Sequence, residues 1–186
     1  MFDPARLSTS AAVFDPQKLK WMNGEYIKEL PVEQVIDLAL PHLITAGKVD
    51  ADMSEERREW IEDVISLYQE QLDYGAEIVE LTDVFFKEEI AYDEAAQAVL
   101  EEEQTIEVLQ VFADYLLQLD RFTPEVIKEQ LKATQKETKH RGRKLFMPVR
   151  VATTGQTNGP ELPKAISLLG KDVVVARLDT VLKELE

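Results

Sequence analysis

Apolar residues recur every three to four positions along most of this chain. Such stripes run through residues 32–40, 60–72, 106–119 and 174–182. This period is typical of helices that bury one face against a core, whereas half-buried strands alternate at every second residue. No convincing alternating segment or hairpin pattern accompanies the stripes. The pattern therefore predicts an all-α protein.

The expected starts of several helices carry a side chain that can accept hydrogen bonds from the free N–H groups of a first turn. These capping residues are Asp15, Ser54, Asp93 and Thr123. Two interruptions are also expected: Asn23–Gly24 should end the first helix, and Pro41 should kink or break the second. Short helices are predicted over residues 145–153 and 162–169, on either side of a turn rich in glycine and proline.

The residues Tyr92 and Asp93 mark the expected boundary between two units. Asp93 is a good N-cap, and sets of amphipathic helices lie both before and after it. A chain of 186 residues is long enough for two small cores. We therefore expect two consecutive helical bundles, formed by residues 1–92 and 93–186.

The net charge of −15 is distributed unevenly along the chain. Residues 1–120 contain 8 basic and 28 acidic side chains, whereas residues 121–186 contain 13 basic and 8 acidic ones. Contact with nucleic acid is decided by a local basic face rather than by the global sum. The acidic total therefore does not exclude an RNA partner for the C-terminal part.

The segment from Lys128 to Arg150 holds eight cations and only two anions. Two interpretations of this run stay open on the residues alone. It could contact phosphate groups, because lysine and arginine beside a turn with free backbone donors suit such a partner. It could also be the solvated face of a helix, which is the more common role of a charge run.

Several classes of function lack support in the sequence. The chain has no cysteine, which excludes a disulfide framework and thiolate metal ligands. The two histidines, His42 and His140, have no partners at metal-site spacing, and no nucleophile and base stand out as a catalytic pair. No apolar run is long enough to span a bilayer and no signal peptide is visible. We expect a cytoplasmic, soluble protein.

Two segments closely resemble one protein family. Residues 145–162 read Leu-Phe-Met-Pro-Val-Arg-Val-Ala-Thr-Thr-Gly-Gln-Thr-Asn-Gly-Pro-Glu-Leu, and residues 12–27 read Ala-Val-Phe-Asp-Pro-Gln-Lys-Leu-Lys-Trp-Met-Asn-Gly-Glu-Tyr-Ile. The first is similar to the C-terminal signature of bacterial glutamyl-tRNA synthetases. The second is similar to the segment that follows their catalytic domain. Both occur in the family's order, so the resemblance covers nearly the whole chain.

The resemblance implies part of a class I aminoacyl-tRNA synthetase, a glutamate–tRNA ligase. The catalytic domain of that family binds ATP and Mg through His-Ile-Gly-His-like and Lys-Met-Ser-Lys-Ser-like motifs, and neither motif is in this sequence. The chain is then expected to be the C-terminal half, inactive alone and without a cofactor of its own. Residues 1–92 would contact the tRNA stem and residues 93–186 would bind the anticodon. The expected partners are glutamate tRNA and the parent's own catalytic domain, with the chain as a monomer.

The resemblance also implies particular RNA contacts. It assigns Arg150 to the first anticodon base, and Gly159, Pro160 and Leu162 to the turn that packs around the anticodon. Some relatives have threonine where this chain has Gly159, which has no side chain to make such a contact. Pro160 and Leu162 have an alternative role in loop rigidity and packing. Arg143 and Lys144 are interpreted as phosphate contacts by their charge alone.

Gln71 falls where family members that reject glutamine tRNA carry an arginine. The anticodons for glutamate and glutamine differ at the third base, C against G. Arginine offers only donors, which suit the acceptors of C and leave a donor unpaired opposite G. A glutamine amide has a donor and an acceptor, so Gln71 predicts a synthetase that also accepts glutamine tRNA. The alternative is that Gln71 is an exposed residue at a helix end.

One rival function comes from another class. The acidic first part of the chain could make it a stand-alone helical module that docks basic protein partners. Such a module would show no preference for tRNA over other polyanions. Salt-dependent binding to a tRNA transcript would distinguish the two functions.

Overall fold

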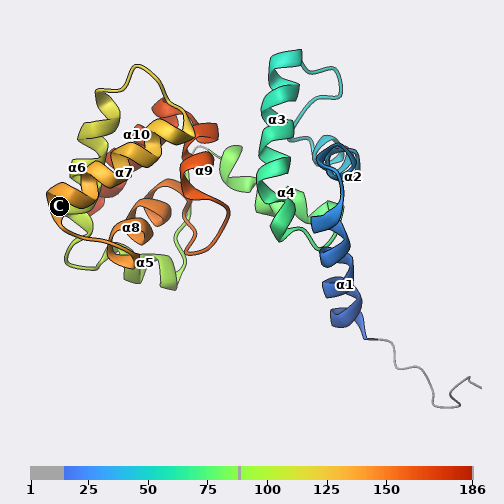
Figure 1. The fold of residues 1–186 in the computed structure, drawn as a ribbon, viewed down its shortest axis with the longest axis horizontal. Helices are drawn as coiled ribbons and strands as arrows, with labels where there is room; N and C mark the ends of the chain where they lie inside the picture. The colour runs from blue at the N-terminus through green and yellow to red at the C-terminus, as the bar shows by residue number, and fades with distance from the viewer. Residues whose placement is uncertain (1–14, 88, 186) are drawn as a thin grey trace, which may run out of the picture.

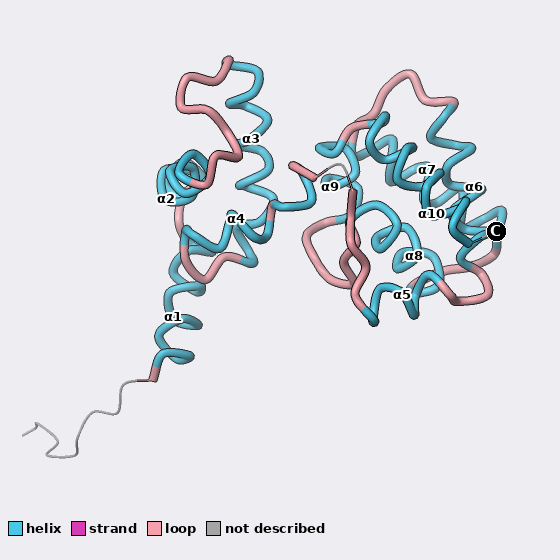
Figure 2. Tube along the Cα trace, turned by 180° about the vertical axis from the view of Figure 1, so that it is seen from behind, coloured by secondary structure: helices cyan, strands magenta, loops and turns pink. Residues whose placement is uncertain are grey.

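A computed structural model describes residues 15–87 and 89–185, and these residues form helices, turns and loops without a strand. Figure 1 shows two groups of helices side by side. Figure 2 shows the same arrangement from behind. The predicted all-α fold with two consecutive bundles is confirmed. The first ten residues, for which no helical period was expected, lie outside the described residues.

The first group is built on three long helices and several short turns. Its elements are α1 (Pro16–Glu29), α2 (Val32–Thr45), α3 (Glu55–Tyr68), η2 (Gln69–Gln71), η3 (Gly75–Glu77), α4 (Ile78–Leu81) and η4 (Asp83–Phe85). The apolar stripes of α2 and α3 face each other and supply most of its core, including Val35, Leu43, Ile61 and Ile65. We call this group the N-terminal unit.

The second group contains six helices around a larger core. Its elements are α5 (Glu94–Leu100), α6 (Thr105–Leu117), α7 (Pro124–Thr138), α8 (Arg143–Thr154), α9 (Leu162–Leu169) and α10 (Lys171–Leu185). Helix α6 lies at the centre of this C-terminal unit, where it packs against α7, α8 and α10. Phe112 and Leu116 of α6 are fully buried there, together with Val84 from the end of the N-terminal unit. The division at residue 92 stays a prediction.

All four predicted capping residues are confirmed. The side chains of Asp15, Ser54, Asp93 and Thr123 each accept a hydrogen bond from a backbone N–H in the first turn of the following helix. Each cap satisfies a donor that the helix itself leaves free, which stabilises the helix by about 1 kcal/mol. The sequence therefore located these four starts correctly.

The expected end of the first helix at Asn23–Gly24 is wrong, because α1 continues to Glu29. Gly24 is buried inside this helix, and a Cβ atom at this position would meet the carboxylate of Asp73. The glycine serves close packing between α1 and the segment after α3. A second glycine has the same role: a Cβ on Gly75 would lie 2.5 Å from the carbonyl oxygen of Leu38 in α2.

Pro41 does not break the second helix, which continues through it to Thr45. Proline removes one helical hydrogen bond, but the side chain is exposed and its neighbours on the buried face stay in place. Ala39, Leu40 and Leu43 are all buried against the rest of the unit. Tertiary burial on both sides of Pro41 therefore outweighs the local defect.

Gly75 provides a test of this close packing. Gly75→Ala should lower the free energy of unfolding by about 1–3 kcal/mol, because the added methyl group must displace the backbone of α2. Urea unfolding followed by circular dichroism measures this change. Ala76→Ser, at an exposed neighbour in the same turn, is the matched control and should unfold almost like the original chain. Equal midpoints for both variants would show that the turn is not packed as described.

Candidate nucleic-acid interface

A groove of about 1070 Å³ lies where the two units meet. The N-terminal unit contributes the last turns of α3 and Gln71 in η2. The C-terminal unit contributes Asn158, Gly159 and Pro160, in the turn before α9, and Lys164, Ser167 and Leu168 of α9 itself. The structure thus brings Gln71 together with two residues of the sequence-predicted turn, although 88 positions separate Gln71 from Gly159 in the chain.

Arg150 lies beneath this turn rather than open to the groove. It projects from α8 and is half-buried, and its Nη2 donates a hydrogen bond of 2.9 Å to the carbonyl oxygen of Pro160. Its Nη1 is buried and has no hydrogen-bond partner among the described residues. The guanidinium therefore supports the turn and keeps one donor nitrogen unused.

The backbone of the turn fits closely over Arg150. Gly159 has φ 141°, and a Cβ added there would lie 3.1 Å from the Nη1 atom of Arg150. A larger residue would press on the guanidinium, so glycine permits this close approach. Leu162 lies deeper, at 4% exposure, and belongs to the core of the C-terminal unit. Its position supports the packing role; contacts of Arg150, Gly159, Pro160 and Leu162 with RNA stay predictions.

Arg143 and Lys144 form the first turn of α8, which begins two residues earlier than predicted. Both side chains are exposed, and Arg143 has only a distant ion pair, at 3.8 Å, with Glu102. The first turn of α8 carries no acidic residue. Cations at the positive end of a helix dipole do not stabilise the helix, so these two charges are available for an anion.

The lining of the groove is acidic, unlike the cation-rich segment from Lys128 to Arg150. Three carboxylates, from Asp63, Glu70 and Glu161, line it, and Lys164 is its only lining cation among the described residues. Lys164 pairs with Glu161 at 3.1 Å. A phosphate group would be repelled by this set of charges, whereas the amino groups of nucleobases are donors that carboxylates accept.

Sequence reasoning missed Lys164 and Tyr68 in this region, and it gave Asn158 no role beyond its place in the turn. Lys164 follows that turn closely in the sequence, so its proximity was the available signal. Tyr68 is only 2% exposed, at the end of α3. Burial raises the pKa of its phenol to about 12, although the charge of Arg150 opposes this rise. No sequence pattern showed that Tyr68 and Arg150 would come near each other.

Neither a metal cluster nor a membrane-spanning helix occurs in the part of the chain that the structure describes. Residues 15–87 and 89–185 contain no cluster of three or more histidine, aspartate or glutamate side chains placed to hold a metal ion. In the same residues, every helix is too short or too polar to cross a bilayer.

Comparison with solved structures defines the fold class. A glutamate tRNA ligase from Elizabethkingia meningosepticum, in complex with its amino acid, matches all of this chain over 36% of its own, with a TM-score of 0.81 and 23% identity. A glutamate-tRNA synthetase from Elizabethkingia anophelis matches 98% of the chain, with a TM-score of 0.75. The helical architecture is therefore one that synthetases of this kind contain.

The chain belongs to the anticodon binding domain family, whose model matches residues 34–182. It is 66% identical over 185 residues to a glutamate–tRNA ligase from Oceanobacillus iheyensis and 58% identical over 181 residues to one from Bacillus subtilis. The resemblance found in the sequence is thereby confirmed. The chain spans 38% of the length of these curated relatives.

The buried phenols predict an alkaline loss of stability. Burial raises the pKa values of Tyr68 and Tyr92 to about 12 in the folded chain, above their usual value near 10. Between pH 10 and 12 the unfolded chain therefore loses protons that the folded chain keeps, so the free energy of unfolding falls as pH rises.

Tyr68→Phe should remove part of this fall, up to about 2–3 kcal/mol across that interval. Denaturant unfolding at pH 9 and at pH 11.5 measures it. Tyr92→Phe should act in the same direction, and the double variant should show the smallest dependence on pH. If the free energy of unfolding of Tyr68→Phe falls with pH as steeply as that of the original chain, this phenol is not buried.

Proposed function

We propose that this chain is the tRNA-reading part of a glutamate–tRNA ligase, and that the groove between its two units receives the anticodon bases. The observation that carries the proposal is the meeting of Gln71 with Gly159 and Pro160 around one groove. Sequence-specific RNA recognition usually targets unstacked bases in loops, and a groove of about 1070 Å³ has room for such bases.

The distribution of charge suits two kinds of contact, with bases in the groove and with phosphate groups outside it. Carboxylates and amides line the groove, so base edges fit there by hydrogen bonding. Phosphate groups fit the exposed cations on α7 and at the start of α8, among them Lys128, Lys132, Arg143 and Lys144. The acidic protein-docking function is not favoured, because the family match and the relatives' names point to tRNA.

Arg150 is proposed to contact the first anticodon base through its unused nitrogen. Nη1 is a buried donor without a partner among the described residues, and leaving such a donor unpaired costs about 1–3 kcal/mol. An acceptor on a base would recover that free energy on binding, once the turn at Gly159 and Pro160 moves aside and uncovers Nη1. In the free chain Pro160 and Gly159 hold the guanidinium in place, and Leu162 fixes the start of α9 in the core.

Aminoacylation is proposed to belong to the rest of the parent enzyme. Relatives that match this chain over 38% of their length are named glutamate–tRNA ligases, and no ATP-binding motif occurs in these 186 residues. ATP and Mg would bind the catalytic domain of the parent, which the present chain would help to align with the acceptor end of the tRNA. We propose that the chain acts in the cytoplasm and binds tRNA as a monomer.

The phosphate contacts predict a specific loss of binding. Replacing both Arg143 and Lys144 with alanine should weaken binding of a glutamate tRNA transcript, and should lower the slope of log K against log salt by about one unit for each lost contact. Fluorescence anisotropy at several salt concentrations measures both effects. The matched control replaces Arg121 and Lys183, two exposed cations of the same unit, and changes the net charge equally.

The proposal requires the control pair to bind nearly like the original chain. Equal losses in the two pairs would show that only the overall charge matters. Binding that does not distinguish tRNA from other polyanions, such as heparin, would contradict the RNA-reading function and return the acidic docking module to consideration.

Gln71 is proposed to permit both C and G at the third anticodon base. Its side chain is half-exposed at the lip of the groove, where no described hydrogen bond engages its amide. The amide can therefore rotate to present either its donor or its acceptor end. The parent enzyme would then charge the tRNAs of both glutamate and glutamine with glutamate.

The test is Gln71→Arg with two anticodon stem–loops that differ only in C or G at the third base. Arginine should weaken binding of the G form by about tenfold to a hundredfold relative to the C form, because it leaves a donor unpaired. Gln71→Glu, which keeps the shape of the side chain and removes its donor, is the control. An unchanged ratio, or an original chain that already rejects the G form, would contradict this role of Gln71.

A further inference from the structure

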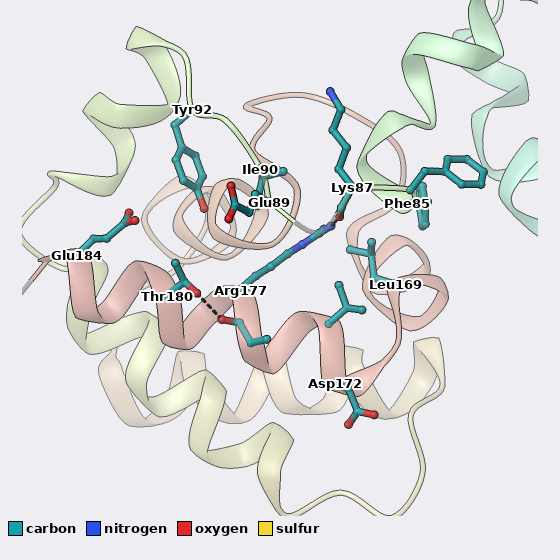
Figure 3. Close-up of a pocket in the computed structure, with 13 residues that line it drawn as sticks. Phe85, Lys87, Glu89, Ile90, Tyr92, Leu169, Asp172, Arg177, Thr180 and Glu184 are labelled. Carbon is teal, nitrogen blue, oxygen red and sulfur yellow. Dashed lines mark hydrogen bonds between the residues drawn. The ribbon is translucent and has the colours of Figure 1, made fainter. Parts of the chain in front are cut away.

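An arginine lies on the buried face of α10, in line with Val174, Leu178 and Val181. This residue, Arg177, is only 5% exposed. Figure 3 shows its side chain leaving α10 and reaching the segment that follows the N-terminal unit, near the backbone of Lys87.

The guanidinium of Arg177 donates three hydrogen bonds to backbone carbonyl oxygens. Nη1 donates to Thr153 at 2.7 Å, and Nη2 donates to Val84 at 2.8 Å and to Lys87 at 2.7 Å. No carboxylate pairs with it among the described residues, and its Nε is buried without a partner. Burying a cation carries a large desolvation cost, so a gain in stability alone does not account for an arginine at this position.

These three carbonyl groups do not line the groove, but they belong to segments next to its two walls. Val84, in η4, and Lys87 follow α4, whose residue Leu81 lines the groove on the N-terminal side. Thr153 lies one turn after Arg150 in α8. The side chain of Arg177 thus links the end of the N-terminal unit to α8, the helix that carries Arg150.

The same junction is tightly packed around α8. Gly155, which ends this helix at φ 72°, lies so close to the backbone that an added Cβ would be 2.9 Å from the carbonyl oxygen of Ala91. The hydroxyl of Thr154 donates to the carbonyl oxygen of Arg150 at 2.7 Å. The end of α8 is therefore fixed against the segment before α5, and the position of Arg150 depends on it.

We propose that Arg177 is a positioning residue that fixes the two walls of the groove relative to each other, so that Arg150 and Gln71 reach the first and third anticodon bases together. This inference rests on the proposed function of the groove. Arg177 contacts no base; it acts through the backbone of α8 and of the segment 84–87. Without it, only a fraction of molecules would present both walls at the correct separation, and apparent affinity would fall by that fraction.

The test is a pair of binding measurements with the anticodon stem–loop of glutamate tRNA. Arg177→Met should weaken binding by about tenfold in the original chain, because only a minority of molecules would then be competent to bind. In a Gln71→Ala background, where one wall has lost its contact, the same change should cost less than about threefold. Arg177→Lys should lie between arginine and methionine, since lysine can reach some of the carbonyl groups. Lys183→Met, an exposed change on the same helix, is the control.

The two backgrounds separate positioning from general destabilisation. A merely structural role would cost the same factor in the original chain and in the Gln71→Ala background, and that result would overturn the proposal, as would an unchanged affinity in Arg177→Met. Circular dichroism establishes that each variant is folded at the assay temperature. If Arg177→Met does not fold, Arg177→Lys is compared in both backgrounds with the same criterion.

A second measurement does not depend on RNA. The chain has no cysteine, so Glu59→Cys on α3 and Glu129→Cys on α7 would carry two spin labels, one on each unit. Pulsed electron paramagnetic resonance should give a narrow distance distribution in the original chain and a broader one in Arg177→Met. An unchanged distribution would overturn the proposal. If the original chain fails to bind the stem–loop, the proposed function is wrong, and the distance distribution alone decides whether Arg177 fixes the two units.

Discussion

The contact of α3 with α9 is the constraint on which the candidate site depends. The indole N–H of Trp60 donates to the carbonyl oxygen of Leu168 at 2.9 Å, so a side chain of the first unit satisfies the backbone of the second. Phe85 and Phe86 pack edge-on against the same indole, with ring centroids 6.1 and 5.9 Å away. This junction holds the two walls of the groove face to face, next to the link that Arg177 makes. A binding site between two units is therefore as well defined as the junction itself.

The acidic net charge and an RNA partner are compatible because the groove and the surface around it carry different charges. The groove is lined by carboxylates and amides, which suits base edges, while the exposed cations of α7 and α8 suit phosphate groups. The large acidic excess of the first 120 residues lies outside the basic segment Lys128–Arg150 and limits non-specific attraction to polyanions. A net charge of −15 is thus compatible with an RNA partner that binds locally.

The sequence predicted those features that depend on neighbouring residues, such as helical periods and the caps at Asp93 and Thr123. It failed where a distant backbone decides the outcome: Gly24 looked like a helix stop, yet the approach of Asp73 explains the glycine. The turn around Gly159 was predicted from its residues, but its meeting with Gln71 is a tertiary result that no local pattern contains. Arg177 was visible as an arginine in an apolar stripe, although its carbonyl partners were not.

The central claim is that the groove between the two units receives the anticodon bases. Titration of the ¹⁵N-labelled chain with the anticodon stem–loop of glutamate tRNA tests it most directly. The account predicts that the backbone amide signals of Gln71, Asn158 and Gly159 shift with the added RNA, while those of Asp114 and Val175, in the cleft between α6 and α10, stay in place. Shifts that gather between α6 and α10, with the groove signals unchanged, would contradict the account.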